Sequence, residues 1–139
     1  SMPPKKAIIQ RKVKNLISKY STANPFTIAQ ELGIHIVYLP LGQVWGFYKK
    51  IYRHKFIFLN NCLPADHKII ACAHELGHAI LHPNTNTVWL REKTFLSPSS
   101  IEREANYFAV ALLKHYHICD YVTLLKLLNT HETLEAVIK

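Results

Sequence analysis

Apolar residues recur at helical spacing near both ends of the chain. The segment from Lys5 to Tyr20 places them among lysines and arginines, which predicts an amphipathic helix with one face toward a core. Asn24-Pro25 marks the start of a second, short helix, which runs to Leu32 and is ended by Gly33. Residues 120–139 return to a helical pattern, as one helix or a pair, whose packing residues are Leu124, Leu125, Leu127, Leu128, Leu134 and Val137.

Three short runs in the first half of the chain have the composition of β-strands. They are rich in β-branched and aromatic residues and cover Ile34 to Pro40, Val44 to Tyr52 and Lys55 to Leu59. The last two runs are separated by Arg53-His54, which predicts a β-hairpin. With the first run they predict a small, mainly antiparallel sheet. A sheet of this kind beside separate helices is typical of the α+β class.

The segment from Thr27 to Ile34 resembles the first helix and turn of a DNA-binding helix-turn-helix, including an alanine and a turn glycine. The residues that follow are β-branched and aromatic and stop at Pro40. A recognition helix is therefore not expected where one is needed, and this segment is not predicted to read DNA.

The most apolar helical run lies in the middle of the chain, from Asp66 as its N-cap to His82, where Pro83 ends it. Residues 83–100 are rich in Asn, Thr, Pro and Ser and predict an irregular connection. Residues 102–116 return to helical spacing, with Ser99 or Ser100 as the cap. The sheet is expected to pack on the central helix and on this later, glutamate-bearing helix.

The length and composition predict one domain. A chain of 139 residues with 49% hydrophobic residues is long enough for one real core and short for two, so we expect a single domain over residues 1–139. Ser1-Met2 resembles the scar of a cleaved tag, and residues 1–4 are expected to be disordered. Neither a secretion signal nor an apolar run of about 18 residues appears. We therefore expect a cytoplasmic protein with no membrane partner.

The three cysteines, Cys62, Cys72 and Cys119, form no CxxC pair, and their odd number argues against a disulfide framework. We expect them to be reduced. Cys72 precedes His74 by two positions, but residues two apart face different sides of a helix, so Cys72 is not expected to share a ligand site with it.

The formal net charge of +8 favours an acidic partner. Nucleic acid is one such partner. Solvated faces of a helix and a hairpin explain the same lysines and arginines, and no base-reading chemistry is evident. Nucleic acid is therefore an alternative partner that the sequence does not favour.

The central helix carries His74-Glu75-Leu76-Gly77-His78, a His-Glu-x-x-His motif. At about 3.6 residues per turn, His74 and His78 lie one above the other on one face, where two imidazoles can bind one zinc ion. Glu75 lies about 100° around the helix axis from His74, so its carboxylate can take a proton from an attacking water near the metal. This division of labour is typical of metal-assisted hydrolysis, with Glu75 as the catalytic base.

A catalytic zinc site normally has three protein ligands, so a third is needed. His82 lies about 12 Å of helical rise beyond His74, too far to share one ion along an unbroken helix. Glu102 and Glu104, on the later helix, are the candidates, and amphipathicity alone does not separate them. Asn106 lies one turn from Glu102 and can accept a hydrogen bond from a ligand histidine. We therefore prefer Glu102 as the third ligand, with Asn106 accepting a hydrogen bond that orients a ligand histidine and with Glu104 as the fallback.

These motifs resemble the ImmA/IrrE family of metallo-endopeptidases. The resemblance covers about residues 24–114 and depends above all on the pairing of His74-Glu75-Leu76-Gly77-His78 with the later run from Glu102 to Ala109. It implies a zincin-like α+β domain with zinc on His74, His78 and Glu102. It also implies cleavage of helix-turn-helix repressors of phages or integrative elements. Related zinc peptidases often carry Asp where this chain has Asn106, so the orienter here is neutral.

Two hypotheses about partners follow from this site. An edge strand, Gly46 to Tyr52 or Lys55 to Leu59, is expected to hold an extended protein substrate by β-augmentation. The alternative to an enzyme is a non-catalytic, metal-stabilised module that captures a transcription regulator or nucleic acid. Replacing Glu75 separates them, because only hydrolysis needs that carboxylate.

Overall fold

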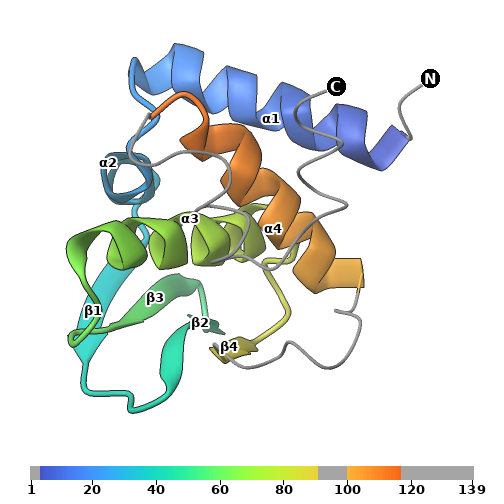
Figure 1. Cartoon of the computed structure of the whole chain (residues 1–139). Coiled ribbons are helices and arrows are strands. Elements are labelled where there is room, and N and C mark those ends of the chain that lie inside the picture. The colour runs from blue at the N-terminus through green and yellow to red at the C-terminus, as the bar shows by residue number, and fades with distance from the viewer. Residues whose placement is uncertain (1–3, 91–99, 117–139) are drawn as a thin grey trace.

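The computed structural model describes residues 4–90 and 100–116, which form four helices and four strands (Figure 1). In chain order they are α1 (Pro4–Tyr20), α2 (Pro25–Glu31), β1 (His35–Leu39), β2 (Val44–Ile51), β3 (His54–Asn60), α3 (Ala65–Leu81), β4 (Thr87–Leu90) and α4 (Ser100–Leu113). Pro4 is already helical, although disorder was predicted through this residue. The helix predicted over 120–139, the Ser99 cap and Cys119 lie outside the described residues.

The strands form one mixed sheet in the order β1-β3-β2-β4. β2 pairs antiparallel with β3 and with β4, whereas β1 pairs parallel with β3. The predictions of an α+β class and of a mainly antiparallel sheet are confirmed. The hairpin turn is displaced by one residue from the predicted position. β2 ends at Ile51, and the turn begins at Tyr52, whose φ is 55°.

The prediction that β2 or β3 is an edge strand is wrong, because both lie inside the sheet and pair on both sides. The prediction that residues 83–100 are irregular throughout is also wrong, since Thr87–Leu90 forms β4. A four-residue strand takes its structure from its pairing partner rather than from its own pattern, which is why local composition did not reveal it.

The first turns of α2 and α3 are capped in different ways. The side chain of Asn24 caps α2 by accepting hydrogen bonds from the backbone N–H groups of Phe26 and Thr27. Asp66 does not cap α3: the N-cap is Pro64, and Asp66 lies in the first turn with its Oδ1 on the backbone N–H and ring Nδ1 of His67. An acidic residue in that turn is still favourable beside the positive end of the helix dipole.

The residues after α2 confirm that no recognition helix forms there. Leu32 and Gly33 end α2, and Gly33 takes φ 74°, a conformation that glycine adopts without strain. The chain then enters β1 instead of a second helix. No helix among the described residues is long and apolar enough to cross a membrane.

The central position of α3 explains its apolar sequence. Figure 1 shows α3 between the sheet and α4, with α1 on the far side of α4. Residues 70–79 of α3 are all buried. Because neighbours cover α3 on opposite sides, the polar side chains of its central part, His74, Glu75 and His78, are held inside the protein.

A buried tyrosine joins the sheet to the end of α3. Tyr48 of β2 is fully buried, and its hydroxyl donates a hydrogen bond of 2.7 Å to the backbone carbonyl of Pro83, two residues beyond α3. This bond fixes the chain where it leaves the helix.

We expect Tyr48→Phe to lower the free energy of unfolding by about 0.5–1.5 kcal/mol, because it removes one buried hydrogen bond and little apolar area. Urea denaturation measures this change. Tyr52→Phe is the control, since the Tyr52 side chain is 93% exposed and no loss is expected. Equal stability of Tyr48→Phe and the wild type would contradict the assignment.

Candidate metal centre

The site lies where α3 and α4 cross at close range. A Cβ atom on Gly77 would lie 3.2 Å from Cα and O of Ala105 and 3.2 Å from Cβ of Phe108. Only glycine fits this contact without moving α4. The close approach brings the first turn of α4 next to the His-Glu-x-x-His face of α3.

Three predicted residues converge across this crossing. Nε2 of His74 lies 3.0 Å from Oε1 of Glu102, and Nε2 of His78 lies 3.0 Å from Oε2 of the same carboxylate. One ligand atom from each of the three residues lies within 4.8 Å of the others. Both histidines are 0% exposed and Glu102 is 7% exposed.

The donor set fits a catalytic zinc ion. Two imidazole nitrogens and one carboxylate oxygen are a known ligand set of such sites, which keep a further position for water or substrate. Burial opposes ionisation of Glu102, but its hydrogen bonds and electrostatic interactions with His74 and His78 outweigh that effect. They hold the pKa of Glu102 well below its ordinary value. The ionised carboxylate is the form that binds a metal.

Glu75 lies beside the three converging residues and is itself 0% exposed. Its Oε2 is 3.9 Å from Nε2 of His74, so the carboxylate reaches the edge of the ligand group without joining it. Strand β2 covers Glu75: a Cβ atom on Gly46 would lie 3.5 Å from Cγ of Glu75 and 2.8 Å from the carbonyl oxygen of Phe58. The backbone of β2 at Gly46 therefore packs against the side chain of Glu75.

The structure separates the two glutamates of α4. Glu102 faces His74 and His78, whereas Oε1 of Glu104 lies 2.7 Å from Nε2 of His82. Glu104, the fallback ligand, is thus outside the converging group. Asn106 is 4% exposed and lies one turn after Glu102. Its role as orienter stays a prediction.

Sequence reasoning excluded His82 as a ligand and gave it no other role. His82 is outside the converging group, but its Nδ1 lies 3.0 Å from Nδ1 of His78. This contact was missed, although the spacing of four residues between the two histidines was available as a signal.

Cys72 is also outside this group. It is 0% exposed, and burial together with the negative charge of Glu75 raises the pKa of its thiol far above the ordinary value. A neutral, buried thiol is a poor ligand and a poor nucleophile.

We therefore expect iodoacetamide at pH 8 to alkylate the exposed Cys62 in the folded protein and to leave Cys72 unmodified. In 8 M urea both cysteines should react. Peptide mass spectrometry measures each site separately, so Cys62 serves as the internal control. Rapid labelling of Cys72 in the folded protein would contradict its burial.

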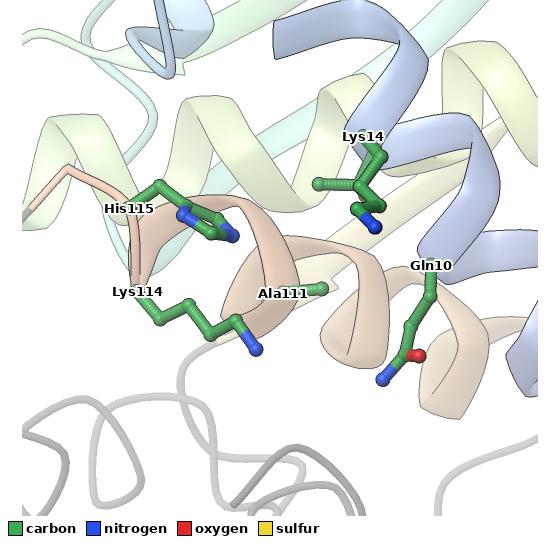
Figure 2. A pocket seen from close by; sticks show the side chains of 6 residues that line it. Gln10, Lys14, Ala111, Lys114 and His115 are labelled. Carbon is green, nitrogen blue, oxygen red and sulfur yellow. The ribbon is translucent and has the colours of Figure 1, made fainter.

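A hollow of about 250 Å³ lies between α1 and the C-terminal end of α4, away from the candidate metal centre. Figure 2 shows Gln10 and Lys14 of α1 on one side, and Lys114 and His115, just after α4, on the other. Glu102 lies at the opposite end of α4. This hollow therefore contains no residue predicted for the metal site.

Comparisons with known proteins agree with this arrangement. The model of the IrrE N-terminal-like domain, peptidase M78, matches residues 29–131. The uncharacterized immunity region protein 2 of Bacillus phage phi105 is 42% identical over 107 residues, which cover 76% of this chain and 68% of that protein. Metallopeptidase ImmA of Bacillus subtilis strain 168 is 31% identical over 107 residues, which cover 76% of this chain and 62% of ImmA.

The matched part thus spans about two thirds of each of these two relatives. No solved structure gave a significant match. The family model covers most of the chain, including the His-Glu-x-x-His helix and the glutamate helix. The chain therefore belongs to the ImmA/IrrE family of metallopeptidases.

Proposed function

We propose that the protein is a zinc-dependent endopeptidase that cleaves a helix-turn-helix repressor of a phage or mobile element. One observation carries the proposal: His74, His78 and Glu102 form a buried group of metal-binding atoms, and Glu75 lies directly beside it. A structural zinc site has four protein ligands, whereas three ligands next to a carboxylate base are typical of hydrolysis.

In this mechanism His74, His78 and the ionised carboxylate of Glu102 would hold the ion. Zinc, when bound, supplies a Lewis acid that activates water and polarises the scissile carbonyl. Glu75 accepts a proton from the attacking water and passes it to the nitrogen of the leaving amine. Burial keeps Glu75 in a low-dielectric environment, which strengthens its interactions with the protons that it transfers.

The sheet order supports β4 as the strand that holds the substrate. Among the strands that the structure describes, β4 is the edge strand next to β2, and β2 lies against Glu75. An extended peptide that pairs with the outer edge of β4 adds a strand to the sheet on the side of the candidate site. Backbone hydrogen bonds of this kind can bind peptides of many different sequences, so pockets beside the strand must supply the selectivity for particular side chains.

The names of the two relatives support the substrate class. One is a metallopeptidase and the other is an immunity region protein of a phage, which agrees with a phage regulatory protein as the target. Because a repressor acts on DNA inside the cell, we place the reaction in the bacterial cytoplasm.

The first test is metal content. The purified protein, equilibrated with Zn²⁺ and then dialysed, should retain one zinc ion per chain by elemental analysis. Glu102→Ala should weaken binding, because one of the three ligands is lost. Glu31→Ala is the matched control, since Glu31 is an exposed glutamate at the end of α2. A wild-type protein that retains no zinc would contradict the proposal.

The second test is cleavage. A candidate helix-turn-helix repressor of a phage or mobile element is co-expressed with the wild-type protein, and the size of the repressor is followed on a gel. A shortened repressor supports the endopeptidase. A stable complex without cleavage would instead support the capture module. If that module captures nucleic acid, its binding to nucleic acid should weaken steeply as the salt concentration rises.

A further inference from the structure

We propose that His82 and Glu104 are positioning residues that orient the imidazole of His78 toward the metal. This inference rests on the proposed function, because it requires an ion at Nε2 of His78. Neither residue belongs to the group of converging ligand atoms. Together they form a chain of hydrogen bonds behind that group.

The contacts run in one line from the site toward the surface. Nδ1 of His78 lies 3.0 Å from Nδ1 of His82, and Nε2 of His82 lies 2.7 Å from Oε1 of Glu104. The side chains of His82 and Glu104 are 9% and 18% exposed, so water competes weakly for both contacts. Lys5 of α1 lies 3.5 Å from Oε2 of Glu104, but it is 65% exposed and adds little.

The donors and acceptors can be assigned without ambiguity once an ion is bound. A neutral imidazole that gives its Nε2 lone pair to a metal keeps its proton on Nδ1. His78 therefore donates from Nδ1 to Nδ1 of His82. His82 must then carry its proton on Nε2, which donates to the carboxylate of Glu104. Every contact has one donor and one acceptor, and the chain ends on a negative charge.

The fold holds His82 in this position by ending α3 there. His82 has φ −132° and ψ 55°, and its backbone N–H still bonds to the carbonyl of His78 at 2.7 Å. The following Pro83 disfavours a helical conformation at His82, and Tyr48 fixes the carbonyl of Pro83. The residue that ends the helix is thereby turned so that its ring contacts His78.

Such partners usually matter for metal binding. A carboxylate or carbonyl that accepts the second ring proton of a ligand histidine fixes the ring orientation and increases its basicity. Here the accepting group is a second imidazole, which passes the influence of Glu104 to His78. Loss of partners of this kind typically weakens metal affinity by about 10–100-fold.

The test is zinc affinity, measured by competition with a chromophoric chelator. We expect His82→Ala to weaken binding by about 10–100-fold. His82→Asn should restore part of the loss, because its side-chain oxygen can accept the proton from Nδ1 of His78. Glu104→Gln should weaken binding in the same direction by less, and it tests the relay even where His82→Ala fails to fold. His54→Ala, at an exposed position at the start of β3, is the control and should bind as the wild type does.

A spectroscopic readout separates positioning from general destabilisation. In the zinc-loaded wild type, NMR should show a slowly exchanging proton on Nδ1 of His78, and His82→Ala should lose this signal to exchange with water. Unchanged affinity together with a retained proton signal in His82→Ala would overturn the relay while leaving the zinc site intact. A wild-type protein that binds no zinc would overturn the proposed function, and the relay with it.

Discussion

Glu75→Gln should reduce the rate of repressor cleavage by about 10²–10⁴-fold, the usual contribution of a positioned general base. Glutamine has the shape of glutamate but cannot accept a proton at neutral pH. Because Glu75 is outside the ligand group, the variant should still retain one zinc ion per chain. The measurement is the initial rate of cleavage at equal zinc content.

The control for this variant is Glu31→Gln, which neutralises an exposed glutamate remote from the site. It should cleave at the wild-type rate. Cleavage by Glu75→Gln at the wild-type rate would show that Glu75 is not the base. Loss of zinc from Glu75→Gln would assign the effect to the ion rather than to proton transfer.

Gly77→Leu should damage both stability and metal binding, because it adds a side chain where α3 and α4 touch. Its Cβ alone would lie 3.2 Å from backbone atoms of Ala105, which cannot rotate away. Overpacking of this kind typically costs about 1–3 kcal/mol of unfolding free energy. Moving α4 outward also displaces Glu102 from the histidines of α3. A loss of about 1.4 kcal/mol in binding would weaken zinc affinity tenfold.

The matched control is Ala65→Leu, which adds the same side chain to the same helix at an exposed position. It should change stability by less than about 0.5 kcal/mol. Urea denaturation and chelator competition give the two quantities for each variant. Wild-type zinc affinity in a folded Gly77→Leu protein would show that the crossing does not control the site.

Much of the candidate site was predictable from sequence because its parts are local. His74 and His78 share a helical face by their spacing alone, and Glu75 follows from the same geometry. The choice between Glu102 and Glu104 needed more, since both flank the apolar stripe of α4. Asn106 lies one turn from Glu102 and can accept a hydrogen bond from a ligand histidine, which favoured Glu102. The structure places Glu102 against His74 and His78.

The features that sequence reasoning missed depend on contacts between distant segments. β4 forms because β2 offers it a partner, and β1 pairs parallel with β3 only through the order of the whole sheet. The contact of His82 with Glu104 spans 22 residues and needs the exact place at which α3 ends. Periodicity along the chain contains none of this information.

The complete burial of Glu75 has a consequence for how fast the protein can work. With 0% of its surface open to water, the carboxylate is out of reach of any peptide bond until the covering atoms move aside. In the proposed endopeptidase, turnover would therefore begin with an opening step, and the rate of cleavage could not exceed the rate of that step. A substrate whose binding drives the opening would be cut in preference to the proteins around it.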